Sequence, residues 1–158
     1  MVIQLLKAAW LPGLIGSILF TGLLLIHHFF GPGPDIRDEK GKRKFPKEFR
    51  TFVVIEFTLL IVMMLSLAAV SVSQFQNAVP EASVIMQIAA GYLVLWIINL
   101  WDLIVIDWVL VVRFRPKQIE LPDTVYFTTM KPHVLDWLGG NVYIVPFAGV
   151  AYLLARLF

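Results

Sequence analysis

Three acidic residues stand inside stretches of sequence that are otherwise strongly apolar. They are Glu56, Asp102 and Asp107, and the stretches around them contain no lysine or arginine. A carboxylate at bilayer depth costs about 2.5–3.5 kcal/mol on insertion scales, so such groups usually mark a pathway or a site. Carboxylates of this kind can bind a proton, a cation or a small polar ligand, and Asp102 is the strongest candidate among them.

Histidines close to the ends of the apolar stretches are candidate partners for these acids. His27 and His28 end the first stretch, and His133 and Asp136 precede the last one. Histidine and carboxylate together suit zinc, iron or manganese, so His28, His133 and Asp136 are the candidate metal ligands. Neither an HExxH motif nor a Glu-x-x-His pair is present. A bis-histidine haem would need His28 and His133 to face each other, and the sequence identifies no cofactor.

Simpler partners for the acids are open alternatives. Arg50, Arg113 and Arg115 stand at the ends of the stretches, and long arginine side chains can reach along a helix. Glu56 would then be an interfacial residue paired with Arg50, and Asp107 would pair with Arg113. A bound cation or a proton would also neutralise the acids.

Four long apolar stretches carry these residues and predict an all-α membrane protein. The stretches are 8–30, 51–73, 84–112 and 138–157. Each can supply the roughly 20 helical residues that cross a hydrocarbon core. Hydrophobic residues make up 59% of the 158-residue chain, and the mean hydropathy is +0.80. We therefore expect one transmembrane domain over residues 1–158, with four helices in an up-down bundle that contacts the lipid bilayer.

Composition excludes several classes of function. The chain has no cysteine, which excludes disulfides, thiol catalysis, cysteine-ligated iron–sulfur clusters and c-type haem attachment. The net charge is only +2 and the basic residues fall between the apolar stretches, so nothing indicates nucleic-acid binding. A chain this small buries little surface of its own, so we expect a homo-oligomer or a partner in a larger membrane complex.

The basic residues predict the orientation in the membrane. Lysine and arginine concentrate in the connections 31–50 and 113–133, whereas the connection 74–83 has neither. Short loops rich in these residues face the cytoplasm. We therefore expect both basic loops inside and both termini outside, with the acids and the histidines toward the inner surface.

Depth and helical phase place the acids of the third stretch together. At 1.5 Å per residue, Asp107 lies about 9 Å and Asp102 about 16 Å from the inner end of that helix. At about 100° per residue, Asn99, Asp102 and Asp107 fall within about 140° of one another, and Trp101 and Trp108 point away toward lipid. Asn99 is more typical of helix packing than of ligand binding. The expected ligand-binding residues share the inner half of the membrane and are Asp102, Glu56, Asp107, Asn99 and His28.

Small residues indicate how the first helix packs. Gly13, Ser17 and Thr21 recur every four residues, which lets a neighbouring helix approach closely, and His28 continues the stripe. His28 is therefore a better candidate than His27 for a position that faces the other helices.

The segment before the last stretch offers two more features. His133, Asp136, Gly140 and Tyr143 form a second stripe at helical spacing. Residues 125–127 are apolar but too short to span a membrane, so they form either an interfacial connector or a cover for the cytoplasmic mouth of the bundle.

One part of the chain resembles a known kind of protein. Residues 99–108 have the sequence NLWDLIVIDW, followed by RPK at 115–117 and LPDT at 121–124. This pattern resembles that of small four-span bacterial membrane proteins of unassigned function. The resemblance implies a bacterial plasma membrane and a single four-helix unit, and it implies no activity.

Three functions fit these observations. The first is a transport- or channel-like protein that binds a proton, a cation or a small polar ligand at Asp102 and Glu56. The second is a metal-dependent enzyme that acts on a lipid or isoprenoid, with the third connection as a lid. The third is an accessory subunit whose acids pair with arginines of a neighbouring protein. The sequence does not decide whether the protein is an enzyme.

Overall fold

Helices make up all the regular structure that the computed structural model describes, which covers residues 1–31, 49–116 and 125–157. Four of them are long and apolar enough to cross a membrane: α1 (Val2–Phe30), α2 (Arg50–Ala78), α3 (Val84–Trp101) with its continuation η2 (Asp102–Phe114), and α5 (Met130–Ala155). A short helix, α4 (Val125–Thr128), precedes α5. The expected all-α protein with four helices of spanning length is therefore confirmed.

Several residues that support the orientation and the resemblance lie outside the described ranges. They are the basic residues within 37–47, Lys117 and residues 121–124. The side of the membrane that the loops and the termini face therefore stays a prediction.

Helix α5 begins at Met130, well before the apolar stretch that predicted it. Thr129 is its N-cap, and Pro132 falls in the first turn, where a missing backbone N–H removes no helical hydrogen bond. His133 and Asp136 were expected to precede the span, and the structure places them inside this helix. Hydropathy missed this start because the first two turns carry polar side chains.

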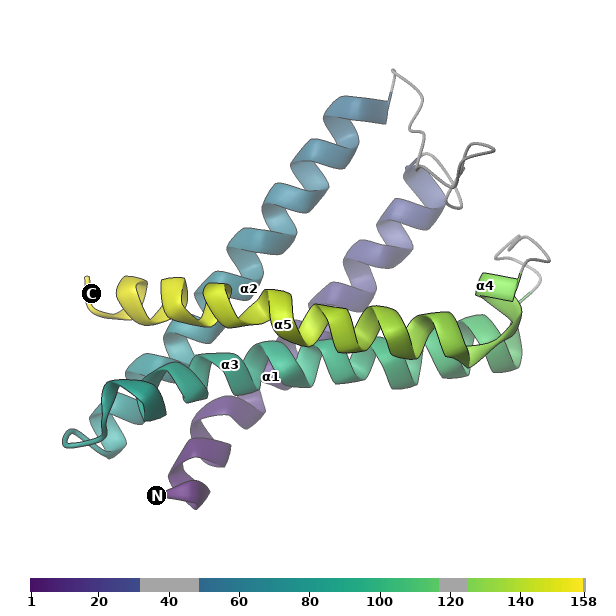
Figure 1. Ribbon diagram of the computed structural model, residues 1–158. Coiled ribbons are helices and arrows are strands. Elements are labelled where there is room, and N and C mark those ends of the chain that lie inside the picture. Colours follow the sequence, from purple (N-terminus) through teal and green to yellow (C-terminus); the bar gives the residue numbers. More distant parts are fainter. Residues whose placement is uncertain (32–48, 117–124, 158) are drawn as a thin grey trace.

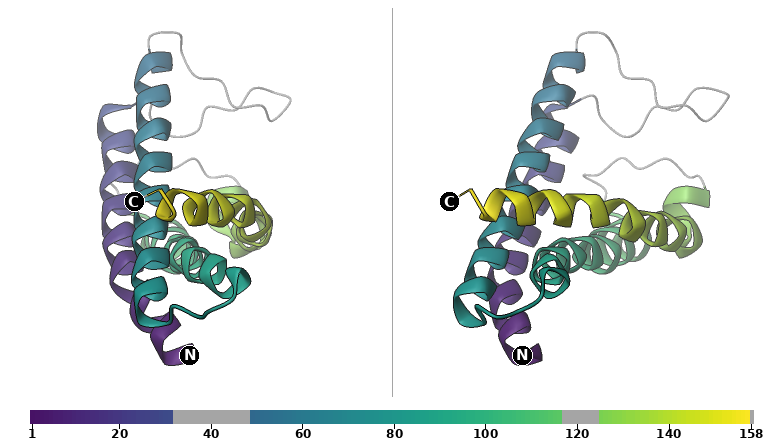
Figure 2. Two further views of the ribbon diagram at one scale, coloured as in Figure 1. Left: turned by 90° about the vertical axis from the view of Figure 1, so that its left-hand side faces the viewer. Right: turned by 60° about the vertical axis from the view of Figure 1, so that its left-hand side comes forward.

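The four spans form two antiparallel pairs that cross steeply. Helices α1 and α2 make one pair, and α3 with η2 makes the other with α5 (Figure 1). The two views of Figure 2 show the second helix pair passing across the first. The C-terminal ends of α1 and η2 therefore point in different directions. The structure does not show the up-down bundle, in which all four axes would lie side by side.

Small residues lie where the two pairs cross. A Cβ atom on Gly16 of α1 would lie 2.5 Å from Ile98 Cδ1 of α3, and one on Gly13 would lie 2.9 Å from Ile97 Cδ1. Gly13 and Ser17 are both buried, which confirms the small-residue stripe. Close backbone approach replaces the hydrophobic driving force that helices lack in lipid.

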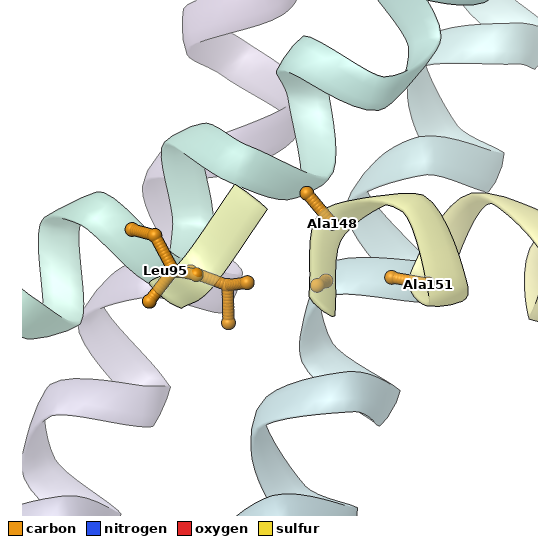
Figure 3. Close-up of a cluster of buried hydrophobic side chains, with 5 residues drawn as sticks. Leu95, Ala148 and Ala151 are labelled. Atoms are coloured by element: carbon orange, nitrogen blue, oxygen red, sulfur yellow. The ribbon is translucent and has the colours of Figure 1, made fainter. Parts of the chain in front are cut away.

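The opposite side of α3 packs on α5 through a compact apolar cluster. Leu95 lies close to Ala148 and Ala151, and Ala68 of α2 and Ile144 complete the group (Figure 3). All five residues are buried. Helix α3 thus contacts α1, α2 and α5 and is the central helix of the fold.

The C-terminal part of the third span, Asp102–Phe114, is wound as a π-helix. Arg115 N donates to Leu110 O at 2.9 Å, which is an i→i+5 bond, and Arg115 then ends the helix with the left-handed angles φ 41° and ψ 63°. Such winding is rare, usually brief and frequent at functional sites. Because a wider turn brings residues five apart onto nearly the same face, Asp102 and Asp107 lie closer in phase than an α-helix would place them.

Candidate functional site

An acid and a histidine meet where η2 packs against α5. Asp107 Oδ1 lies 2.9 Å from His133 Nδ1, and the side chain of His133 is only 2% exposed. The early start of α5 places His133 in its first turns, opposite the π-wound segment. A buried imidazole therefore faces a carboxylate within a membrane-spanning pair of helices.

The geometry of this contact is electrostatic rather than a directed hydrogen bond. Asp107 Oδ1 lies within reach of His133 Nδ1 but without the alignment of a directed hydrogen bond, and the backbone of Tyr126 also acts on the imidazole. Asp102 is half-buried and close enough for its charge to act on His133 and on Asp107. The charge of Asp136 acts on both members of the contact.

Helix α4 covers this group from the loop side. The Tyr126 ring lies with its centroid 4.7 Å from that of His133, and its hydroxyl donates to Asp136 Oδ2 at 2.9 Å. Helix α4 contacts α5 and η2. Tyr126 thus lies against the site, and the choice between an interfacial connector and a cover of the cytoplasmic mouth stays a prediction. We call Asp102, Asp107, His133, Asp136 and Tyr126 the Asp107–His133 cluster.

Glu56 does not belong to that cluster. Its Oε2 lies 2.5 Å from His27 Nδ1, and the two side chains are 13% and 26% exposed, respectively. Within the described residues, α2 makes no contact with η2 or α4. The single pocket predicted for Glu56, Asp102 and Asp107 is therefore divided into this cluster and a separate Glu56–His27 pair. The reason is the steep crossing, which separates the C-terminal end of α1 from the C-terminal end of η2 (Figure 2).

His27, and not His28, is the histidine that pairs with the acid. His28 lies edge-to-face against its neighbour Phe29, with ring centroids 5.1 Å apart. The small-residue stripe pointed to His28 because it was extended over two further turns. Helix α1 crosses α3 near Gly13 and Gly16, so a stripe set by that contact says little about the far end of the helix.

Metal binding at the predicted ligands has no support in the geometry. Among the residues that the structure describes, no three histidine, aspartate or glutamate side chains are placed to hold one ion. His28 lies at the end of the α1–α2 pair, whereas His133 and Asp136 lie on α5. Asp136 is exposed and accepts the Tyr126 hydroxyl.

Helical phase predicted the surroundings of Asn99 and Trp108 on the third span correctly and those of Trp101 wrongly. Asn99 has its amide 3.5 Å from the Trp137 carbonyl and packs on Gly140, which is a helix-packing role. Trp108 is 52% exposed, as expected. Trp101 was expected to face lipid, but its indole N–H donates to Thr21 Oγ1 of α1 at 3.1 Å. A central helix has protein on several sides, so the side opposite the polar face is not free for lipid.

The stripe predicted on α5 is only partly correct. His133 is buried, but Asp136 is exposed and Tyr143 is 75% exposed. The packed face instead runs from His133 through Trp137 toward Ala148. Sequence reasoning missed Trp137 and gave Tyr126 no individual role, although the four-residue step from His133 to Trp137 indicates a shared face.

Comparison of the chain with protein-family models, with curated proteins and with solved structures found no match. The resemblance to small four-span bacterial proteins therefore stays a prediction. What is known of the site comes from its geometry.

Proposed function

We propose that this membrane protein is transport-like and binds a proton at the Asp107–His133 cluster. The observation that carries the proposal is the buried His133 ring, whose Nδ1 lies 2.9 Å from Asp107 Oδ1 with Asp102 close by. Charged groups are costly at this depth, and the third span supplies two acids without a lysine or arginine beside them. A proton is the smallest cation that can neutralise the carboxylate of Asp102 or Asp107.

A proton suits this arrangement better than a metal ion does. An imidazole and a carboxylate in contact can exchange one proton over a short distance, and histidine changes charge near neutral pH. The cluster places three titratable carboxylates around one ring: Asp102 and Asp107 from η2, and Asp136 from α5. Tyr126 of α4 shields the ring from the loop side.

The membrane orientation completes the proposal. If the basic loops face the cytoplasm of a bacterial plasma membrane, the cluster opens toward that side under α4. Asp107 then lies nearer the inner surface and Asp102 one turn deeper. Protons would enter past Asp136 and Tyr126 and reach Asp107 and His133 first.

Proton uptake by reconstituted protein tests the proposal. We expect Asp107→Asn to lower uptake by liposomes after a pH jump by about 100-fold, since removal of a positioned proton acceptor typically has an effect of that order. We expect Asp102→Asn to lower it as well. Glu81→Gln is the matched control, because Glu81 is an exposed acid in the turn before α3. Wild-type uptake by the Asp107→Asn protein would overturn the proposal.

A further inference from the structure

The buried face of α5 changes character along its length. Its second half packs through Ile144, Ala148 and Ala151, and the last two lie close to Leu95 (Figure 3). Its first half carries polar groups instead, beginning with His133. The interface with the third span is therefore apolar at one end and polar at the other.

Buried nitrogens without a partner concentrate in this polar half. In the part of the chain that the structure describes, three buried side-chain atoms lack a hydrogen-bond partner: His133 Nδ1, His133 Nε2 and Trp137 Nε1. The two residues are four apart on one helix, so their side chains are neighbours on the same face. The unpartnered atoms thus form one local group.

The hydrogen bonds at Trp137 involve its backbone carbonyl and not its indole nitrogen. The amides of Asn99 and Asn141 both approach the Trp137 carbonyl, at 3.5 Å and 2.8 Å. Trp101, an indole on α3, donates its N–H to Thr21 of α1. Buried polar groups almost always find a partner in protein or in ordered water. The Trp137 indole N–H takes part in none of these hydrogen bonds, so a partner for it is expected from outside the chain.

We propose that a bound water molecule lies between His133 and Trp137. Water can accept from the Trp137 indole N–H and from a His133 Nε2–H, and it can donate to the nearby Asp102 carboxylate, which gives the usual number of about three hydrogen bonds in protein interiors. The nearby carboxylates of Asp102 and Asp107 disfavour an anion at this place. A neutral ligand that both donates and accepts fits the group, and water is the smallest one.

This water would extend the Asp107–His133 cluster into a relay, a role that rests on the function proposed above. The protonated Asp107 carboxyl gives its proton to His133 Nδ1. His133 Nε2 releases a proton to the water, and the water passes one to the Asp102 carboxylate. Asp107 ends as the anion, Asp102 as the neutral acid, and His133 and water are both neutral again.

Solid-state NMR of the whole protein in lipid bilayers tests the water site directly. With ¹⁵N-labelled indoles, we expect polarisation from water to reach the Trp137 N–H. Trp101 is the matched control, because its N–H is satisfied by Thr21 and should stay dry. The two indole signals can be assigned through backbone correlations, so this measurement needs no variant protein. A Trp137 indole as dry as that of Trp101 would overturn the proposal.

A functional readout separates this inference from the proposed function. We expect Trp137→Phe to slow proton uptake by roughly fivefold to tenfold, the equivalent of about one hydrogen bond, and Trp101→Phe to leave it unchanged. If Asp107→Asn blocks uptake while Trp137 is dry, proton binding stands and the water site is wrong. If Trp137 is hydrated while Asp107→Asn takes up protons normally, the water site stands and the proposed function is wrong.

Discussion

At the scale of single residues, two of the acids in the apolar helices are each in contact with a histidine. Asp107 contacts His133, and Glu56 contacts His27. Both contacts join helices that are adjacent in the chain's antiparallel pairs. The arginine partners that the sequence left open for Glu56 and Asp107 stay a prediction beside these two histidine contacts.

The hydrogen bond between Trp101 and Thr21 joins the two helix pairs, and its energy can be measured. We expect Trp101→Phe to lower the free energy of unfolding by about 0.5–1.5 kcal/mol, the usual net value of one hydrogen bond. Thr21→Val should lower it by a similar amount. Since each change removes the same bond, the double variant should cost less than the sum, measured by unfolding in mixed micelles. Strict additivity would show that the bond contributes nothing.

At the scale of elements, winding decides which residues share a face. An α-helix separates Asp102 and Asp107 by about 140°, whereas the i→i+5 bonding of η2 brings them nearer in phase. The same segment leaves Trp108 exposed to lipid. Local winding therefore contributes to the cluster as directly as the residue types do.

The crossing of α1 and α3 depends on the absence of a side chain at Gly16. We expect Gly16→Val to destabilise the protein by about 1–3 kcal/mol, because overpacking forces the helices apart. Gly22→Val is the control on the same helix, since a Cβ there meets nothing within 4 Å. Thermal unfolding in detergent compares the two. Equal midpoints for both variants would contradict the close approach at Gly16.

At the scale of the whole molecule, the steep crossing keeps two polar groups apart. The Glu56–His27 pair lies toward the C-terminal end of α1, and the Asp107–His133 cluster lies toward the C-terminal end of η2. These two helix ends are apart in Figure 2. The two groups share no helix. The described residues thus form two separate acid–histidine contacts, and Glu56 does not share a pocket with Asp107.

This separation predicts independent energetics. Effects of Glu56→Gln and Asp107→Asn on the free energy of unfolding should add within about 0.3–0.5 kcal/mol, as they do for distant sites without shared partners. Unfolding of the two single variants and the double variant in mixed micelles measures this. A larger coupling would mean that the acids share one pocket, as the sequence alone predicted.

The sequence by itself determined four membrane-spanning helices, because a run of apolar side chains long enough to cross a bilayer needs no partner to define it. It also determined that Glu56, Asp102 and Asp107 require neutralisation and that Gly13 and Ser17 face a helix. Only the tertiary structure decided which histidine each acid meets. That choice depends on how the two helix pairs cross. Contacts between residues far apart in the chain leave no periodic signal in the sequence.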